Sequence, residues 1–180
     1  MNDMYKAMKK LQESKNNDFF FFNQGLEKAK EVTKREGRLN CCDIVSEEVS
    51  ELAKQYHVNC KPVNLKVITK NDNGTSHSVI LYNNYGKLVI IDYTQKQFFG
   101  SNSPEDTKCD VIEMISSDYS NSSNGTYFDG GLFSNNKFYY DGKEIKDINL
   151  YNDDSHNFIR DFNDGIIKTD DDAIIYLYEA

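Results

Sequence analysis

The sequence predicts an α+β protein in which N-terminal helices pack on an antiparallel β-sheet. Apolar residues recur at helical spacing in the first third of the chain and at strand spacing from residue 63 onward, and clusters of Asn, Gly, Ser and Asp separate the later segments. A chain of 180 residues is long enough to bury a core. We therefore expect one domain over residues 1–180, helical over about 1–60 and β-sheet over about 61–180.

Two apolar stripes predict helices near the N-terminus. In each stripe the apolar residues are three or four positions apart, which places them on one face of a helix. Gly37 follows the second stripe and predicts the end of that helix. The first stripe consists of Met4, Met8 and Leu11, and the second of Leu26, Ala29 and Val32.

A third helix is predicted to begin at a pair of cysteines in NCCDIVSEEVSELAKQYHV. Asn40 is a good N-cap, and Asp43 follows it at the position of a capping box. Cys41 is then the first helical residue and begins an apolar stripe, so we expect its side chain to face the core. The stripe continues with Val45, Val49 and Leu52.

Strands are predicted in the second part of the chain because short apolar runs alternate with turn residues. The runs are VNLKVIT, SVILY, KLVII, CDVIEMI, FYY and AIIYLY. The segment SSDYSNSSNGTYFDGG predicts a long surface loop between the fourth and fifth of these runs.

The hairpin HSVILYNNYGKLVIID, residues 77–92, has a histidine at one end and an aspartate at the other. If the loop is centred between Asn84 and Tyr85, His77 lies directly opposite Asp92, with Cβ atoms roughly 4.5–5.5 Å apart. The carboxylate can then accept the imidazole N–H, fix its tautomer and raise its pKa. A structural cross-strand pair is the alternative interpretation.

Cys41 supplies the third group of a catalytic arrangement. At the start of a helix, free backbone N–H groups and the helix dipole stabilise a thiolate, and a nearby imidazolium lowers the pKa of the thiol further. A cysteine, a histidine and an orienting aspartate are what thiolate attack on an acyl carbon requires. The alternative for Cys41 is a small buried apolar residue.

These residues resemble those of the papain-like fold, and more narrowly papain-fold toxin domains of bacterial polymorphic toxins and protein-glutamine deamidase effectors. The matching segments are NCCDIVSEEVSEL and HSVILYNNYGKLVIIDYTQKQF, which lie within residues 40–98, about a third of the chain. The resemblance implies a papain-like fold in which the Cys-bearing helix packs against the sheet. It implies a catalytic triad of Cys41, His77 and Asp92, with Cys42 as the alternative nucleophile and Asn40, Gln24 and Gln95 as candidate oxyanion or cleft residues.

Together these features predict a thiol-dependent amidohydrolase that acts on a protein, either a cysteine protease or a protein-glutamine deamidase. We expect a bacterial toxin or effector domain, with a cognate immunity protein as a partner. An amine in place of water would make the same site a transglutaminase. The alternative from another class is a non-enzymatic acidic interaction protein, such as an immunity protein that sequesters a basic toxin.

Composition limits the partners and the location. The net charge of −8 argues against nucleic acid and anionic membranes as partners. Acidic residues concentrate near the C-terminus, where a solvated face or a basic partner would explain them. The sequence shows no apolar run of ~20 residues and no signal-peptide pattern. We expect reduced cysteines, no metal and no cofactor, in a cytosol that a secretion system reaches.

Overall fold

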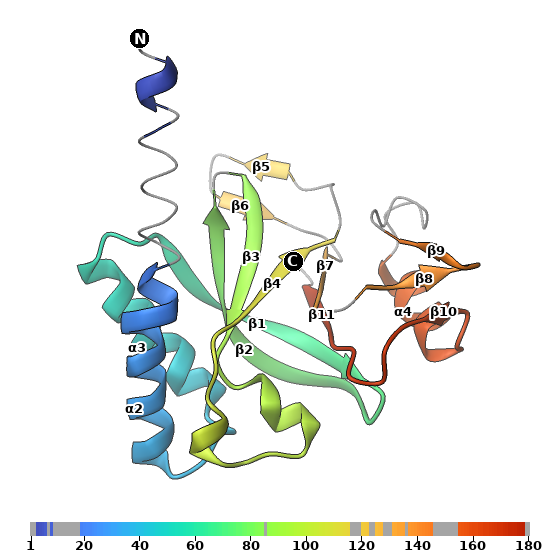
Figure 1. Ribbon diagram of the computed structural model, residues 1–180, viewed down its shortest axis with the longest axis horizontal. Helices are drawn as coiled ribbons and strands as arrows, with labels where there is room; N and C mark the ends of the chain where they lie inside the picture. The colour runs from blue at the N-terminus through green and yellow to red at the C-terminus, as the bar shows by residue number, and fades with distance from the viewer. Residues whose placement is uncertain are drawn as a thin grey trace. The chain divides into compact units, whose positions relative to one another are not determined.

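The α+β class is confirmed by the structure, a computed structural model that combines helices with antiparallel sheets (Figure 1). It describes residues 3–6, 8, 19–84, 86–115, 120–122, 125–127, 131–135, 137–145 and 155–178. Residues 3–6 and 8 are helical. The other helices are η1 (Phe21–Gly25), α2 (Leu26–Glu36), α3 (Cys42–Gln55), η2 (Gln95–Phe99), η3 (Pro104–Asp106) and α4 (Ser155–Asn163).

Six strands are hydrogen-bonded in the order β1-β11-β7-β4-β3-β2 and form a closed barrel. These are β1 (Cys60–Thr69), β2 (Asp72–Asn84), β3 (Lys87–Asp92), β4 (Asp110–Met114), β7 (Gly131–Ser134) and β11 (Ile175–Tyr178). Two smaller sheets consist of β10-β8-β9 and β5-β6. Their strands are β5 (Ser120–Ser122), β6 (Gly125–Tyr127), β8 (Tyr139–Tyr140), β9 (Lys143–Glu144) and β10 (Ile167–Lys168).

The chain divides into two compact units. Unit 1 comprises Met1–Val63 and Ser78–Val111, and unit 2 comprises Asn64–His77 and Ile112–Ala180. The predicted helical part, residues 1–60, falls in unit 1, whereas the predicted sheet part contributes to both units. The single domain over residues 1–180 stays a prediction.

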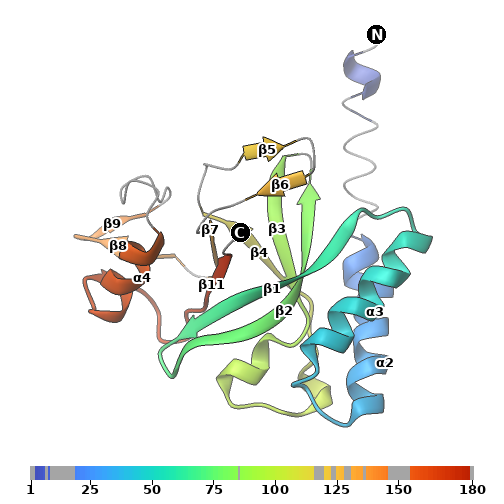
Figure 2. The same ribbon diagram turned by 180° about the vertical axis from the view of Figure 1, so that it is seen from behind.

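Unit 1 is built around helices α2 and α3, which lie side by side (Figures 1 and 2). Gly37 ends α2 in the left-handed conformation, as predicted, with φ 69°. The buried faces of both helices share one apolar cluster with the β2–β3 hairpin. The cluster contains Phe20, Phe21, Ala29, Val32, Cys41, Val45, Val49, Ala53, Val58, Ile80, Tyr82, Val89, Ile91 and Tyr93.

Unit 2 has an apolar cluster of its own that the sequence reasoning largely missed. Helix α4 was not predicted, although Phe158, Ile159 and Phe162 follow helical spacing. Phe138 packs edge-on against Phe158, with ring centroids 5.4 Å apart. The remaining members of the cluster are Ile68, Ile145, Ile167, Ala173, Ile175 and Leu177.

The predicted surface loop SSDYSNSSNGTYFDGG is only partly irregular. It contains the two-stranded sheet β5-β6, in which Asn121 pairs with Thr126. Its last residue, Gly131, begins β7. Residues 116–119, 123–124 and 128–130 of this segment lie outside the described residues.

Candidate functional site

The predicted nucleophile, Cys41, caps helix α3 instead of starting it. Helix α3 begins at Cys42, and the carbonyl of Cys41 accepts the first helical hydrogen bond from the N–H of Val45 at 3.1 Å. The predicted cap at Asn40 is therefore wrong by one residue. The side chain of Asn102 explains the shift, because its Oδ1 accepts hydrogen bonds from the N–H groups of Leu39 and Asn40 and so holds the segment before the helix.

The thiol of Cys41 is fully buried. Its relative exposure is 0%, and its Sγ donates a hydrogen bond to the carbonyl of Arg38 at 3.4 Å. Burial raises the pKa of this thiol above its ordinary value, and the nearby charge of Arg38 offsets the effect only in part. The pKa shift predicted from the sequence has the opposite direction, because a helix start stabilises a thiolate. The arrangement found favours the protonated thiol.

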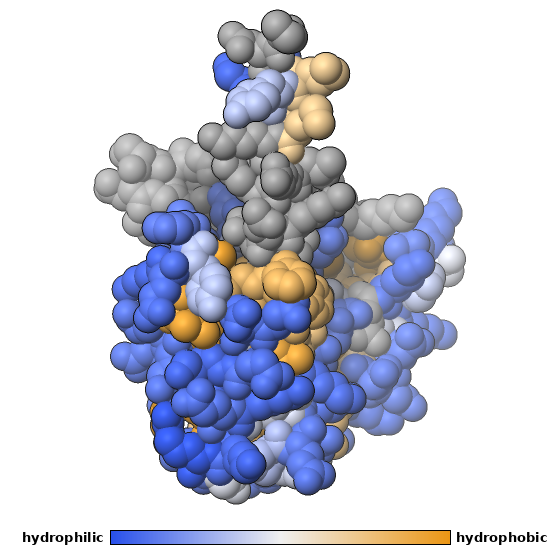
Figure 3. All heavy atoms as spheres, turned by 60° about the vertical axis from the view of Figure 1, so that its left-hand side comes forward, coloured by the Kyte–Doolittle hydropathy of each residue, from blue (hydrophilic) through white to orange (hydrophobic). Residues whose placement is uncertain are grey.

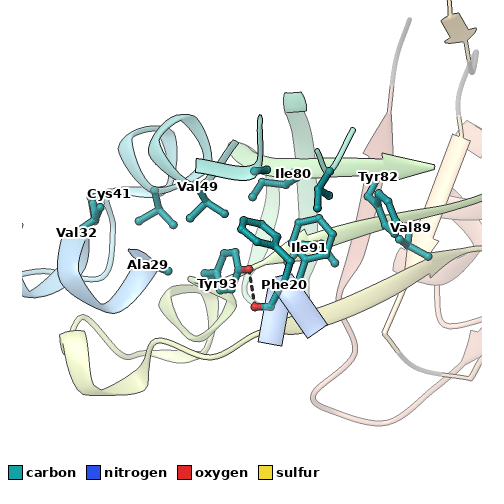
Figure 4. Close-up of a cluster of buried hydrophobic side chains, with 14 residues drawn as sticks. Phe20, Ala29, Val32, Cys41, Val49, Ile80, Tyr82, Val89, Ile91 and Tyr93 are labelled. Atoms are coloured by element: carbon teal, nitrogen blue, oxygen red, sulfur yellow. Dashed lines mark hydrogen bonds between the residues drawn. The ribbon is translucent and has the colours of Figure 1, made fainter. Parts of the chain in front are cut away.

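Cys41 faces one side of the β2–β3 hairpin. Figure 4 shows it among Val32, Val49 and the other residues of the unit 1 cluster, which includes Ile80 and Ile91 from the hairpin. These two strand residues are paired, so they lie on the same face of the hairpin. The stripe predicted for α3 is confirmed at Cys41, Val45 and Val49, which are buried, whereas Leu52 is only partly buried.

Asp92 lies on the other face of the hairpin. Successive side chains of a strand point to opposite faces. Because Ile91 faces the helices, its neighbour Asp92 points away from the face that Cys41 contacts. The structure therefore does not bring the predicted nucleophile and the predicted orienting carboxylate together.

The predicted register of the hairpin is wrong by two residues. The observed pairs include Asn84 with Lys87 and Ile80 with Ile91. In this register the position opposite Asp92 belongs to Val79, so His77 and Asp92 do not face each other directly. The turn is one residue further along than predicted, because Gly86 takes the positive φ, 90°, that the turn requires.

His77 belongs to unit 2 and is packed there as a buried aromatic ring. Its relative exposure is 1%, and its ring lies 6.3 Å from the ring of Tyr176, centroid to centroid.

Asp92 belongs to a buried polar group in unit 1. Its relative exposure is 1%, and its Oδ1 accepts hydrogen bonds from the N–H of Thr94 at 3.0 Å and from the Thr94 hydroxyl at 3.4 Å. A second carboxylate, Asp110, is close enough for the two charges to repel. The pKa of Asp110 is raised, first by burial and then by the charge of Asp92, while Lys96 and Lys108 oppose the shift.

The remaining predicted site residues occupy varied positions in unit 1. Asn40 is exposed, and Gln24 is exposed on η1. Gln95 is buried at the start of η2, with 4% exposure. Cys42 is partly exposed and is the first residue of α3.

Two further features were looked for among the described residues, a cluster of metal ligands and a membrane-spanning helix. Within them, no group of three or more His, Cys, Asp or Glu side chains is arranged to hold a metal ion. No described helix combines the length and the apolar character that crossing a bilayer would require.

The sequence reasoning missed an exposed aromatic surface on unit 1, which we define as Phe19, Phe22 and Tyr56. Their relative exposures are 63%, 51% and 48%. Figure 3 shows apolar side chains at the surface of this helical part of the molecule. The signal was the run FFFF: Phe20 and Phe21 point into the core, so the two flanking rings are left outside.

A hollow of about 650 Å³ adjoins the aromatic surface and shares Tyr56 with it. Leu52 of helix α3 and Tyr56, the residue after the end of that helix, contribute to its wall. Helix α2 and η1 contribute charged and polar side chains, namely Gln24, Glu27, Lys28, Lys30, Glu31 and Lys34.

Comparison of the chain with protein-family models, with curated proteins and with solved structures found no match.

Proposed function

We propose that this chain is a protein-binding module, and that its function does not use Cys41 as a nucleophile. The aromatic surface carries the proposal. Large apolar side chains that stay exposed together on a folded surface mark interaction sites, and aromatic residues are enriched in the cores of protein interfaces.

The aromatic surface is held by ordered structure beneath it. The ring of Tyr56 packs on the buried ring of Phe20, with centroids 5.2 Å apart. Tyr93 donates a hydrogen bond to the carbonyl of Phe21 at 2.8 Å, which fixes η1 to the end of the hairpin (Figure 4). A surface that is ordered before binding loses less conformational entropy when a partner docks.

The buried state of Cys41 supports binding over thiol chemistry. A nucleophilic thiol must reach its substrate, and it reacts as the thiolate. Cys41 is fully buried, its pKa is raised, and Asp92 lies on the opposite face of the hairpin. An interaction protein fits these features better than a hydrolase that depends on Cys41.

The proposal is tested by capturing partners from the cells that express the chain. We expect the wild type to retain a specific protein, identified by cross-linking and mass spectrometry, and Phe22→Asp with Tyr56→Asp to lose it. Phe99→Asp is the matched control, because Phe99 is an aromatic residue with 36% exposure on η2. Partner retention that does not respond to the aromatic surface, or that is lost equally in the control, contradicts the proposal.

A papain-like thiol hydrolase is the second candidate, and one observation favours a version of it that uses Cys42. Cys42, not Cys41, occupies the first position of α3, where backbone N–H groups stabilise a thiolate, and it is partly exposed. This candidate predicts that Cys42→Ala abolishes a mass change or cleavage in a target protein, whereas Cys41→Ala does not. If neither the wild type nor the variants alter any target, this candidate fails.

A further inference from the structure

The N-terminal helical residues carry an apolar stripe whose side chains are exposed. We define the N-terminal stripe as Met4, Tyr5 and Met8, whose relative exposures are 67%, 68% and 64%. A helix with apolar residues at this spacing normally buries them against another element. Unit 1 therefore exposes two sets of large apolar side chains, the N-terminal stripe and the aromatic surface.

We infer that a second copy of this chain covers both surfaces in a two-fold dimer. This inference rests on the proposed function and names the partner of the aromatic surface. In a two-fold arrangement each protomer offers the same patch, so the contact closes on itself.

The exposed area matches what a stable dimer requires. The six side chains have between 48% and 68% of their surface exposed. Because a large apolar side chain offers about 200 Å² for burial, they present about 700 Å² on each protomer. Specific interfaces bury about 800 Å² per partner, so polar side chains at the rim need to add only a small share.

The charge of unit 1 also favours association with a second copy. Its sequence contains fourteen Lys and Arg residues and fourteen Asp and Glu residues, so the unit is neutral. Unit 2 contains seven basic and fifteen acidic residues and carries the whole net charge of −8. Two copies that meet through unit 1 therefore bring together units that carry no net charge.

The test is the mass in solution of the full chain across a wide concentration series, measured by analytical ultracentrifugation. We expect the wild type to shift from 20.8 kDa to twice that mass as concentration rises. Phe22→Asp should be monomeric over the series, and so should Met4→Asp with Met8→Asp. Phe99→Asp should dimerise as the wild type does. Circular dichroism of each variant checks that the helices are retained.

Two results overturn the inference. One is a wild type that stays at 20.8 kDa at every concentration, and the other is a dimer that survives substitution of either surface. If the wild type is monomeric while Phe22→Asp with Tyr56→Asp still loses a captured partner, the dimer fails and the proposed function stands. If the wild type dimerises as expected but captures no other protein, the second copy is itself the partner.

Discussion

Cys41 illustrates what a periodic pattern can and cannot predict about one residue. Its place in a stripe with Val45 and Val49 correctly predicted burial, because periodicity reports which side chains face the core. Reactivity depends on what fills the space beyond the side chain, and here that space holds Val32 and the hairpin residues of the cluster. A thiol that is removed from water keeps its proton, so the features that predicted its position did not predict its chemistry.

Asp110 should make the stability of the protein depend on pH. Its Oδ2 is buried and has no hydrogen-bond partner among the described residues, and its pKa is raised by burial and by Asp92. A carboxyl whose folded pKa exceeds its unfolded value binds more protons in the folded state. Its contribution is therefore favourable at low pH, and it is lost as pH rises from 3.8 through the raised pKa.

We expect Asp110→Asn to remove this dependence. The free energy of unfolding of the variant, relative to the wild type, should increase as pH rises from 3.8 through the raised pKa of Asp110 and then level off. Urea titrations over a pH series measure this difference in free energy. Glu47→Gln, which removes a carboxylate from an exposed position of α3, is the control and should show no such trend. A difference between Asp110→Asn and wild type that is flat with pH contradicts the expectation.

Among the elements, the β2–β3 hairpin was predicted in its strands and faces but not in its register. A shift of two residues moves no side chain to the other face of the hairpin. In the observed register Leu81 and Ile90 are paired and lie on the same face. The turn position depends on which residue takes positive φ, and Gly86, not the preceding Asn-Asn pair, decided it. Strand β8 lies within the predicted run FYY. The two-residue strands β9 and β10 were not predicted, because they are too short to show a period. Helix α4 was also missed, although its apolar residues follow helical spacing.

Two residues with positive φ should respond to substitution in opposite directions. Gly86 has φ 90°, so Gly86→Ala forces a Cβ into an unfavourable conformation and should destabilise the protein by about 1 kcal/mol. His57 has φ 57° just after α3, where the N–H of Val58 bonds to the carbonyl of Ala53 at 2.9 Å.

His57 occupies the position that glycine usually fills just after a helix C-terminus. His57→Gly should therefore stabilise the protein by about 0.5 kcal/mol. Chemical denaturation of both variants measures the two changes. Equal signs for the two substitutions would contradict this account of the backbone.

For the whole molecule, the sequence predicted the fold class and the concentration of acidic residues near the C-terminus. Both depend on local segments, the first on the spacing of apolar residues and the second on composition. It did not predict the division into two units, since strands β1, β2 and β4 each contribute residues to both. Nor did it predict the aromatic surface, because a phenylalanine run indicates burial until the structure shows which rings the core can accommodate.

The most direct test of the central claim is the alkylation rate of Cys41 in the native chain, followed residue by residue with fragment ions in tandem mass spectrometry, because Cys41 and Cys42 lie in the same peptide. At about pH 6, well below the ordinary thiol pKa of ~8.5, we expect Cys41 to stay unlabelled in the native state and to react only after unfolding in urea. The partly exposed Cys42 and Cys109 serve as internal references in the same sample. Native labelling of Cys41 that is faster than labelling in urea would mean an accessible, activated thiolate, and would contradict the proposal that this protein acts by binding.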